Sequence, residues 1–155
     1  MSDAPHDPGH WLWRLSASGW CQAAARELEA GAARVGSRRT AITHARRAAG
    51  MALNGVLVAI AGAGADRMSC ETRWGRSYID HLRALAGGDD ETRAPLSLAA
   101  AASARALLEI GVMPERGLVQ LSAGAHAPAR QALELAETLV RACAEVVADA
   151  DQART

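Results

Sequence analysis

The sequence contains no phenylalanine and a single tyrosine, and aromatic residues make up 3% of its 155 residues. β-Strands favour aromatic and β-branched side chains, so this scarcity argues against a sheet. Half of the residues are apolar, and alanine and leucine dominate that half. Because both residues favour helices, we expect an all-α fold, in one domain large enough to bury a core.

Cysteine is also scarce: Cys21, Cys70 and Cys143 are odd in number and far apart in the sequence. No pair has the spacing of a zinc site, so we expect no metal and no other cofactor. Cys143 falls on the apolar face of a helical pattern and is expected in the core.

Long apolar runs are missing as well. The longest, around residues 55–65, is short and rich in glycine, so we expect no membrane-spanning helix. The N-terminus has no basic region followed by an apolar run, so we expect no secretory signal and a cytoplasmic protein. Lysine is absent, and the 17 arginines are balanced by 17 acidic residues. A neutral chain carries no general nucleic-acid footprint, which leaves only a local arginine patch open.

The best-defined helix is expected over residues 41–60, where apolar residues recur at spacings of three and four. Its face consists of Ile42, Ala45, Ala49, Leu53, Val56 and Ile60. The residues near its start are small, and small residues let a neighbouring helix approach closely. We therefore predict that this helix, begun by Ser37 or Thr40, is the central helix of a tight bundle.

Four more helices are expected around it. The first follows Pro8 and includes Trp13, Trp20 and Leu28 on its apolar face; the others cover residues 77–86, residues 95–110 after a Thr92 cap, and a last helix from Ala127. Residues 65–75 are expected to form a polar connection. The prediction is an up-and-down antiparallel bundle of four to five helices over residues 10–148, between a flexible tail (1–9) and a polar C-terminal tail (149–155).

Several segments resemble the HEPN family (higher eukaryotes and prokaryotes nucleotide-binding domain). They are WLWRLSASGWCQAAARELEAG at 11–31, THARRAAGMALNGVL at 43–57, SYIDHLRALAG at 77–87 and ARQALELAETLVRACAEVV at 129–147. The sequence departs from the family at Gly50, where a longer polar residue is usual, and in its glycine-rich 62–64 connection. The resemblance implies a HEPN-like bundle that pairs as a homodimer. It also implies either a metal-independent ribonuclease or a nucleotide-binding or partner module beside a nucleotidyltransferase, as in toxin–antitoxin pairs.

The ribonuclease members carry an arginine followed, after four to six residues, by a histidine. Arg76 and His81 match this spacing, as do Arg39 and His44. A histidine can move the 2′-hydroxyl proton, and an arginine can hold the phosphate. However, residues five apart on a helix are rotated by about 140°, so such a pair needs a frayed helix start or a dimer partner. We rank Arg76 and His81 first, and the alternative is a surface or interface histidine.

The densest basic cluster also suggests an anion site. Arg39, His44, Arg46 and Arg47, with Arg38, surround the expected start of the central helix, where backbone N–H groups can bind phosphate. The alternative is a solvated basic face balanced by Glu27 and Glu29. Trp11, Trp13 and Trp20 present a similar choice between bundle core and a partner interface.

The leading functional hypothesis is a HEPN-like accessory protein that binds nucleotide, nucleic acid or a partner protein, without strong catalysis. The first alternative is a metal-independent HEPN ribonuclease that uses Arg76 and His81. The second is a structural or scaffolding helical-bundle dimer that uses the tryptophans as its contact surface.

Overall fold

The computed structural model describes residues 11–62, 72–93, 95–112 and 126–155. Within these residues the chain is helical and contains no strand. In chain order its elements are η1 (Trp11–Arg14), α1 (Ala17–Ala32), α2 (Arg38–Gly62), α4 (Tyr78–Gly87), α5 (Asp90–Arg93), α6 (Leu98–Glu109) and α7 (Ala127–Arg154). The expected all-α class is confirmed.

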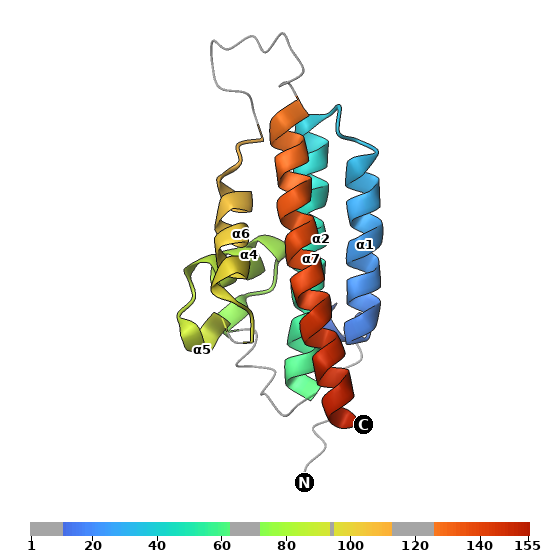
Figure 1. Cartoon of the computed structure of the whole chain (residues 1–155), viewed down its shortest axis with the longest axis vertical. Coiled ribbons are helices and arrows are strands. Elements are labelled where there is room, and N and C mark those ends of the chain that lie inside the picture. The colour runs from blue at the N-terminus through green and yellow to red at the C-terminus, as the bar shows by residue number, and fades with distance from the viewer. Residues whose placement is uncertain (1–10, 63–71, 94, 113–125) are drawn as a thin grey trace.

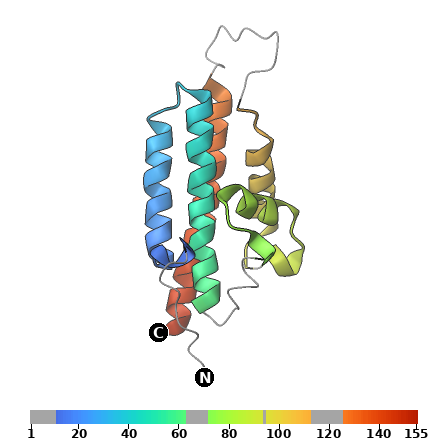
Figure 2. The same ribbon diagram turned by 180° about the vertical axis from the view of Figure 1, so that it is seen from behind.

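The long helices alternate in direction: α1 and α6 run one way, and α2 and α7 run the other (Figure 1). Helices α2 and α7 pack against each other at the centre, α1 packs on both of them, and α6 packs on α7. The short helix α4 fills the space between α2 and α6, on the side away from α1 (Figure 2). The up-and-down antiparallel bundle is therefore confirmed, with α4 and α5 as additions to its second side.

Helix α2 is central because its side chains are small. Five of its alanines are fully buried: Ala41, Ala45, Ala48, Ala49 and Ala52. Where α1 crosses α2, Gly55 allows the close approach, since a Cβ atom there would lie 2.9 Å from the Ala17 carbonyl oxygen. The predicted central helix and its small face are thus confirmed.

The first helix begins later than the sequence predicts. Ser16 caps the N-terminus of α1 by accepting a hydrogen bond from the Gly19 amide (3.0 Å), and Trp11 and Trp13 precede the helix in η1. The indole Nε1–H of Trp20 donates to the Leu12 carbonyl (2.9 Å) and so holds η1 against α1. This hydrogen bond is a physical reason for the turn between η1 and α1.

The starts of the remaining helices agree in part with the sequence prediction. Ser77 caps α4 as the sequence suggests, and α7 begins at Ala127. Helix α6 is capped by Ser97 instead of Thr92, because Pro95 lies outside it in a separate turn. Residues 113–125, between α6 and α7, lie outside the described residues, and so do the tail at 1–9, Gly64 and Cys70.

The end of α7 differs from the expected polar tail. The helix continues to Arg154, whose Nη2 donates to the Ala59 carbonyl near the end of α2 (3.0 Å). This hydrogen bond ties together the last turns of the two central helices. As predicted, Cys143 of α7 lies fully buried in the core. None of the described helices is long and apolar enough to cross a bilayer.

Candidate functional site: an arginine groove around Tyr78

The only tyrosine of the sequence, Tyr78, lines two pockets together with residues of η1, α1, α2 and α4. Tyr78 is the first residue of α4 and packs directly on Gly50 of α2. A Cβ atom at position 50 would lie 2.3 Å from the Tyr78 Cβ and 2.7 Å from its Cα. The missing side chain of Gly50 is therefore what allows α4 to begin this close to α2.

Two pockets share the Tyr78 side chain. The first, which we call the Arg14 pocket, has a volume of about 310 Å³ and is lined by Arg14, Trp20, Arg76, Ser77 and Tyr78. The second, the Arg47 pocket, has a volume of about 250 Å³ and is lined by Thr43, Arg46, Arg47, Tyr78 and Ile79. Each pocket thus contains two arginines, and none of the described residues that line them is acidic.

Electrostatics around the phenol reflect these arginines. Burial raises the pKa of Tyr78; the charge of Arg47 lowers this pKa in part, the charge of Glu27 raises it, and Arg14 has the smallest effect, which lowers it. The phenol is therefore neutral at physiological pH and can donate a hydrogen bond. Two arginines and the Glu27 carboxylate that pairs with Arg47 therefore all act on the phenol.

The start of α4 forms part of the Arg14 pocket. Ser77 caps the helix: its hydroxyl accepts from the Asp80 amide (3.0 Å), and Asp80 places a carboxylate in the first turn. The hydrogen bonds from Ser77 also lower the pKa of Asp80, whose carboxylate is solvent-exposed. Gly75, with a φ of +73°, turns the chain into this cap; a Cβ atom there would lie 2.5 Å from the Asp80 Cβ.

The residues of the predicted basic cluster do different things in the structure, and two of them cap α6. Arg46 donates to the carbonyl groups of Leu107, Leu108 and Ile110, at 3.2, 3.1 and 2.7 Å from its Nη2, and so caps the C-terminus of α6. Arg38 does the same at Gly111 (2.9 Å). Cations stabilise the negative end of a helix dipole, so these two arginines hold α6 against α2.

His44 and Arg47 both bind Glu27 of α1. His44 Nδ1 lies 2.7 Å and Arg47 Nη1 lies 3.1 Å from the same Glu27 oxygen. The balance by Glu27 that the sequence suggested is present, whereas Glu29 lines a different groove, between α1 and α7. Of the predicted phosphate ligands, Arg46 and Arg47 line the Arg47 pocket, while His44 and the exposed Arg39 do not.

The burial of His81 argues against the predicted catalytic pair of Arg76 and His81. His81 is 0% exposed; its Nδ1 lies 2.8 Å from the Trp74 carbonyl and its Nε2 lies 2.7 Å from Asn54 Oδ1. A buried ring cannot reach a 2′-hydroxyl, and it is not a surface or interface histidine either. Arg76, in contrast, is exposed and lines the Arg14 pocket.

The described tryptophan side chains are buried or half-buried and do not form an exposed contact surface. Trp20 is 7% exposed and belongs to the core, and Trp13 is half-buried against it. The Trp11 side chain lies outside the described part of the structure. Trp74, in the segment expected to be a polar connection, is 4% exposed and belongs to the core, so that connection was wrongly assigned at this position.

Sequence reasoning did not single out Arg14 or Tyr78 as a site residue. These two residues come together only because η1 and α4 pack near α2 in the fold, which no local sequence pattern indicates. In residues 11–62, 72–93, 95–112 and 126–155, no three His, Cys, Asp or Glu side chains gather in a way that could hold a metal ion.

Comparisons with known proteins leave the chain without an assigned relative. No protein-family model, no curated protein and no solved structure matches it. The resemblance to the HEPN family therefore rests on the sequence segments given above.

Proposed function

We propose that this chain is a HEPN-like accessory protein that binds a phosphate-bearing ligand, a nucleotide or nucleic acid, in the groove around Tyr78. The observation that carries the proposal is the pair of pockets on either side of one tyrosine, each lined by two arginines. Arginine is the residue best suited to hold phosphate, because its planar guanidinium donates two parallel hydrogen bonds.

The setting strengthens this reading. The whole chain has a formal net charge of zero, so the four arginines that line the two pockets are a local concentration. Arg46 also caps α6 and Arg47 also pairs with Glu27, so Arg14 and Arg76 carry most of the proposal.

Ser77 and Tyr78, at the N-terminus of α4, line the Arg14 pocket, and the first turn of this helix carries the Asp80 carboxylate. The half-buried Tyr78 is the residue common to both pockets, and its aromatic ring is of a kind that can stack on a base.

Neither alternative function has such support. The ribonuclease hypothesis needs an accessible histidine, and His81 is buried. The scaffold hypothesis needs exposed tryptophans, whereas Trp20 is in the core and Trp13 is half-buried; the Trp11 side chain lies outside the described part of the structure. The homodimer, the nucleotidyltransferase partner, the toxin–antitoxin role and the cytoplasmic location are parts of the proposal that derive from sequence reasoning alone.

Replacing Arg76 with alanine should weaken ligand binding by about tenfold or more, because it removes a charged hydrogen-bond donor from the Arg14 pocket. Arg14→Ala should have a similar effect. Binding is measured by isothermal titration calorimetry at low salt, with ATP and with a single-stranded octanucleotide as probes.

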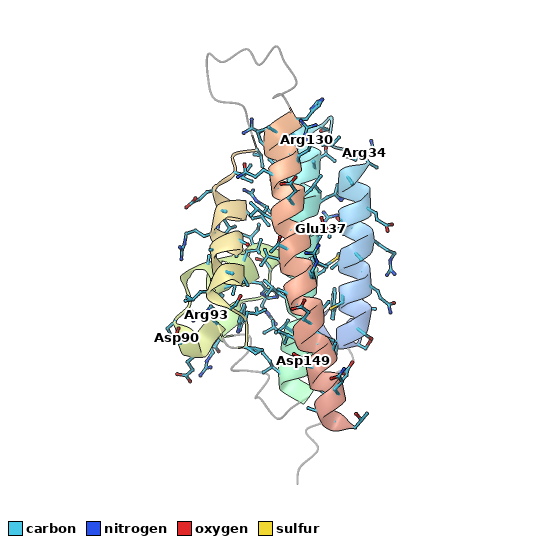
Figure 3. The ribbon with its side chains drawn as sticks, viewed as in Figure 1. Arg34, Asp90, Arg93, Arg130, Glu137 and Asp149 are labelled. Carbon is cyan, nitrogen blue, oxygen red and sulfur yellow. The ribbon has the colours of Figure 1, made fainter. Side chains whose placement is uncertain are left out.

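The matched control is Arg141→Ala. Arg141 pairs with Glu137 on α7 (3.2 Å), and Figure 3 labels Glu137 on that helix. No residue of α7 lines either of the two pockets around Tyr78. This variant should bind like the wild type. If no probe binds the wild type, or if all three variants bind equally well, the arginine groove is not a phosphate site.

A further inference from the structure

One carboxylate oxygen of α1 binds two basic side chains of α2. The Oε1 atom of Glu27 lies 2.7 Å from the His44 Nδ1 and 3.1 Å from the Arg47 Nη1. The Glu27 and His44 side chains are 16% and 22% exposed, whereas the Arg47 side chain is 46% exposed and lines the Arg47 pocket. The three residues therefore connect a partly buried contact between α1 and α2 with a guanidinium that an anion in solution can reach.

The net charge of this group of three depends on the histidine. An ionised carboxylate can only accept hydrogen bonds, so the Nδ1 of His44 carries the hydrogen that lies toward Oε1. While the ring is neutral, the carboxylate balances the positive charge of Arg47. Protonation of the ring at Nε2 adds a second positive charge. Histidine is the side chain whose ordinary pKa places such a change between pH 5 and 8.

Among the described residues, Glu27 is the acidic group that contacts His44. A Cβ atom on Gly31 of α1 would lie 2.9 Å from the His44 Cβ and 2.8 Å from the Leu133 Cδ2, so α7 presents an apolar side chain here. From α4, the phenol of Tyr78 is close enough for the charges of Arg47 and Glu27 to act on its pKa. The charged residues beside Leu133 line the groove between α1 and α7; they are Glu29, Arg130, Glu134 and Glu137.

We propose, on the basis of the phosphate-binding function above, that Glu27 and His44 form a pH-dependent switch on Arg47. While the ring is neutral, Glu27 holds the Arg47 guanidinium and competes with an anionic ligand for it. When the ring is protonated, the carboxylate shares its charge between two cations, and its attraction for Arg47 decreases. Arg47 then becomes available to an anion in the Arg47 pocket. Arg14 and Arg76 bind the ligand in both states, so the switch adjusts the affinity of the groove.

The test is the affinity for single-stranded dT8 without a terminal phosphate, measured at pH 7.5 and at pH 5.5. Neither its phosphodiesters nor its thymine bases change charge between these pH values, so a difference in affinity arises from the protein. The wild type should bind about fivefold more tightly at pH 5.5, because a positive charge is added at a partly buried position beside the pocket. Isothermal titration calorimetry at constant low ionic strength gives the affinities, and circular dichroism at both pH values shows that the protein is folded.

Three variants locate the effect. His44→Asn keeps a hydrogen-bond donor near the position of Nδ1 but cannot become charged, so its affinity should be the same at both pH values. Arg47→Gln should bind like the wild type at pH 7.5, where Glu27 holds the arginine, and should lack the gain at pH 5.5. Glu27→Gln removes the competing carboxylate and should bind about fivefold more tightly than the wild type at pH 7.5.

The matched control is His126→Asn, which removes an exposed histidine that precedes α7 and lines neither pocket. This variant should keep the pH dependence of the wild type. Loss of the gain at pH 5.5 in His126→Asn would place the titrating group there and would overturn the switch. A gain that persists in His44→Asn or in Arg47→Gln would overturn it as well. Weaker binding by Glu27→Gln at pH 7.5 would do the same, because the carboxylate would then position Arg47 for the ligand.

The remaining outcomes distinguish this inference from the proposed function. If the wild type binds dT8 equally well at both pH values and Arg76→Ala weakens that binding, the switch is wrong and the phosphate site at Arg14 and Arg76 stands. Absence of dT8 binding at both pH values would remove the switch together with the phosphate site.

Discussion

Replacing Gly50 with alanine is expected to destabilise the fold by about 1–3 kcal/mol, the usual cost of overpacking. The added Cβ would lie 2.3 Å from the Tyr78 Cβ and 2.7 Å from its Cα, so rotating the tyrosine side chain cannot relieve the clash. The start of α4 must move away from α2. The better helix propensity of alanine offsets only about 1 kcal/mol of this cost. Chemical denaturation of the purified protein measures the change.

The same substitution should weaken phosphate binding, because Tyr78, Ser77 and Arg76 move with the start of α4. The matched control is Gly87→Ala at the exposed end of α4, where a Cβ atom meets nothing within 4 Å. That variant should be as stable as the wild type and should bind ligand normally. A Gly50→Ala protein with wild-type stability would show that α2 and α4 are not packed as closely as described.

Replacing His81 with alanine is expected to cost about 3 kcal/mol or more, through the cavity left by the ring and the loss of two buried hydrogen-bond partners. The ring links Trp74 before α4 to Asn54 of α2. Removing it leaves the Trp74 carbonyl and the Asn54 amide without this partner in the core. The free energy of unfolding in urea at neutral pH measures this loss.

His81 should also make the stability depend on pH. Burial lowers its pKa below the ordinary value of 6.5, while the backbone carbonyl of Trp74 and the charge of Asp80 raise it in part. Below pH 6.5 the unfolded chain therefore binds a proton that the folded chain does not, and stability falls as the pH decreases. The contribution is present in full above pH 6.5 and decreases by at most about 1.4 kcal/mol per pH unit below it.

The comparison with His81→Leu isolates this effect. The leucine variant is expected to be less stable at pH 7.5, yet to lose less stability between pH 7.5 and 5 than the wild type. The Glu27–His44 contact is common to both proteins and cancels in the comparison. Parallel stability curves for the two proteins would contradict a neutral, buried His81.

The hydrogen bonds of His81 also assign its protons. The Trp74 carbonyl can only accept, so Nδ1 carries a hydrogen, and the Nε2 of a neutral ring must then accept. Asn54 can supply that donor when its amide is turned so that Nδ2 faces the ring. This orientation also gives a partner to Nδ2, which has none among the described residues when Oδ1 faces the ring.

The parts of the fold that sequence could predict are those written in a local pattern. The three-and-four spacing around Ala45 and Ala49 gives α2, and Ser77 marks the start of α4. His81 had a readable signal as well, since it lies three residues after Tyr78 and four before Leu85, on the apolar face of its helix. A histidine on such a face is more consistent with the core than with catalysis.

The rest depends on contacts between distant segments. Trp74 stands among polar residues in the sequence, and only the fold buries it. The local pattern around Arg46 suggests a phosphate ligand. In the fold, however, its guanidinium donates to the carbonyl group of Leu107, 61 residues away, and caps the C-terminus of α6. The groove itself combines Arg14 with Arg76 and Arg47, which no spacing in the sequence connects.

The most direct test of the central claim is to locate the bound ligand by NMR. The protein is labelled with ¹⁵N and titrated with single-stranded dT8, and the signals of the backbone amides and of the arginine side-chain Nε–H groups are followed. The amides of Ser77, Tyr78 and Ile79 and the Nε–H groups of Arg14, Arg47 and Arg76 should shift in a saturable way, while that of Arg141 stays in place. Saturable shifts confined to α7, or no saturable shift at the start of α4, would contradict the arginine groove as the binding site.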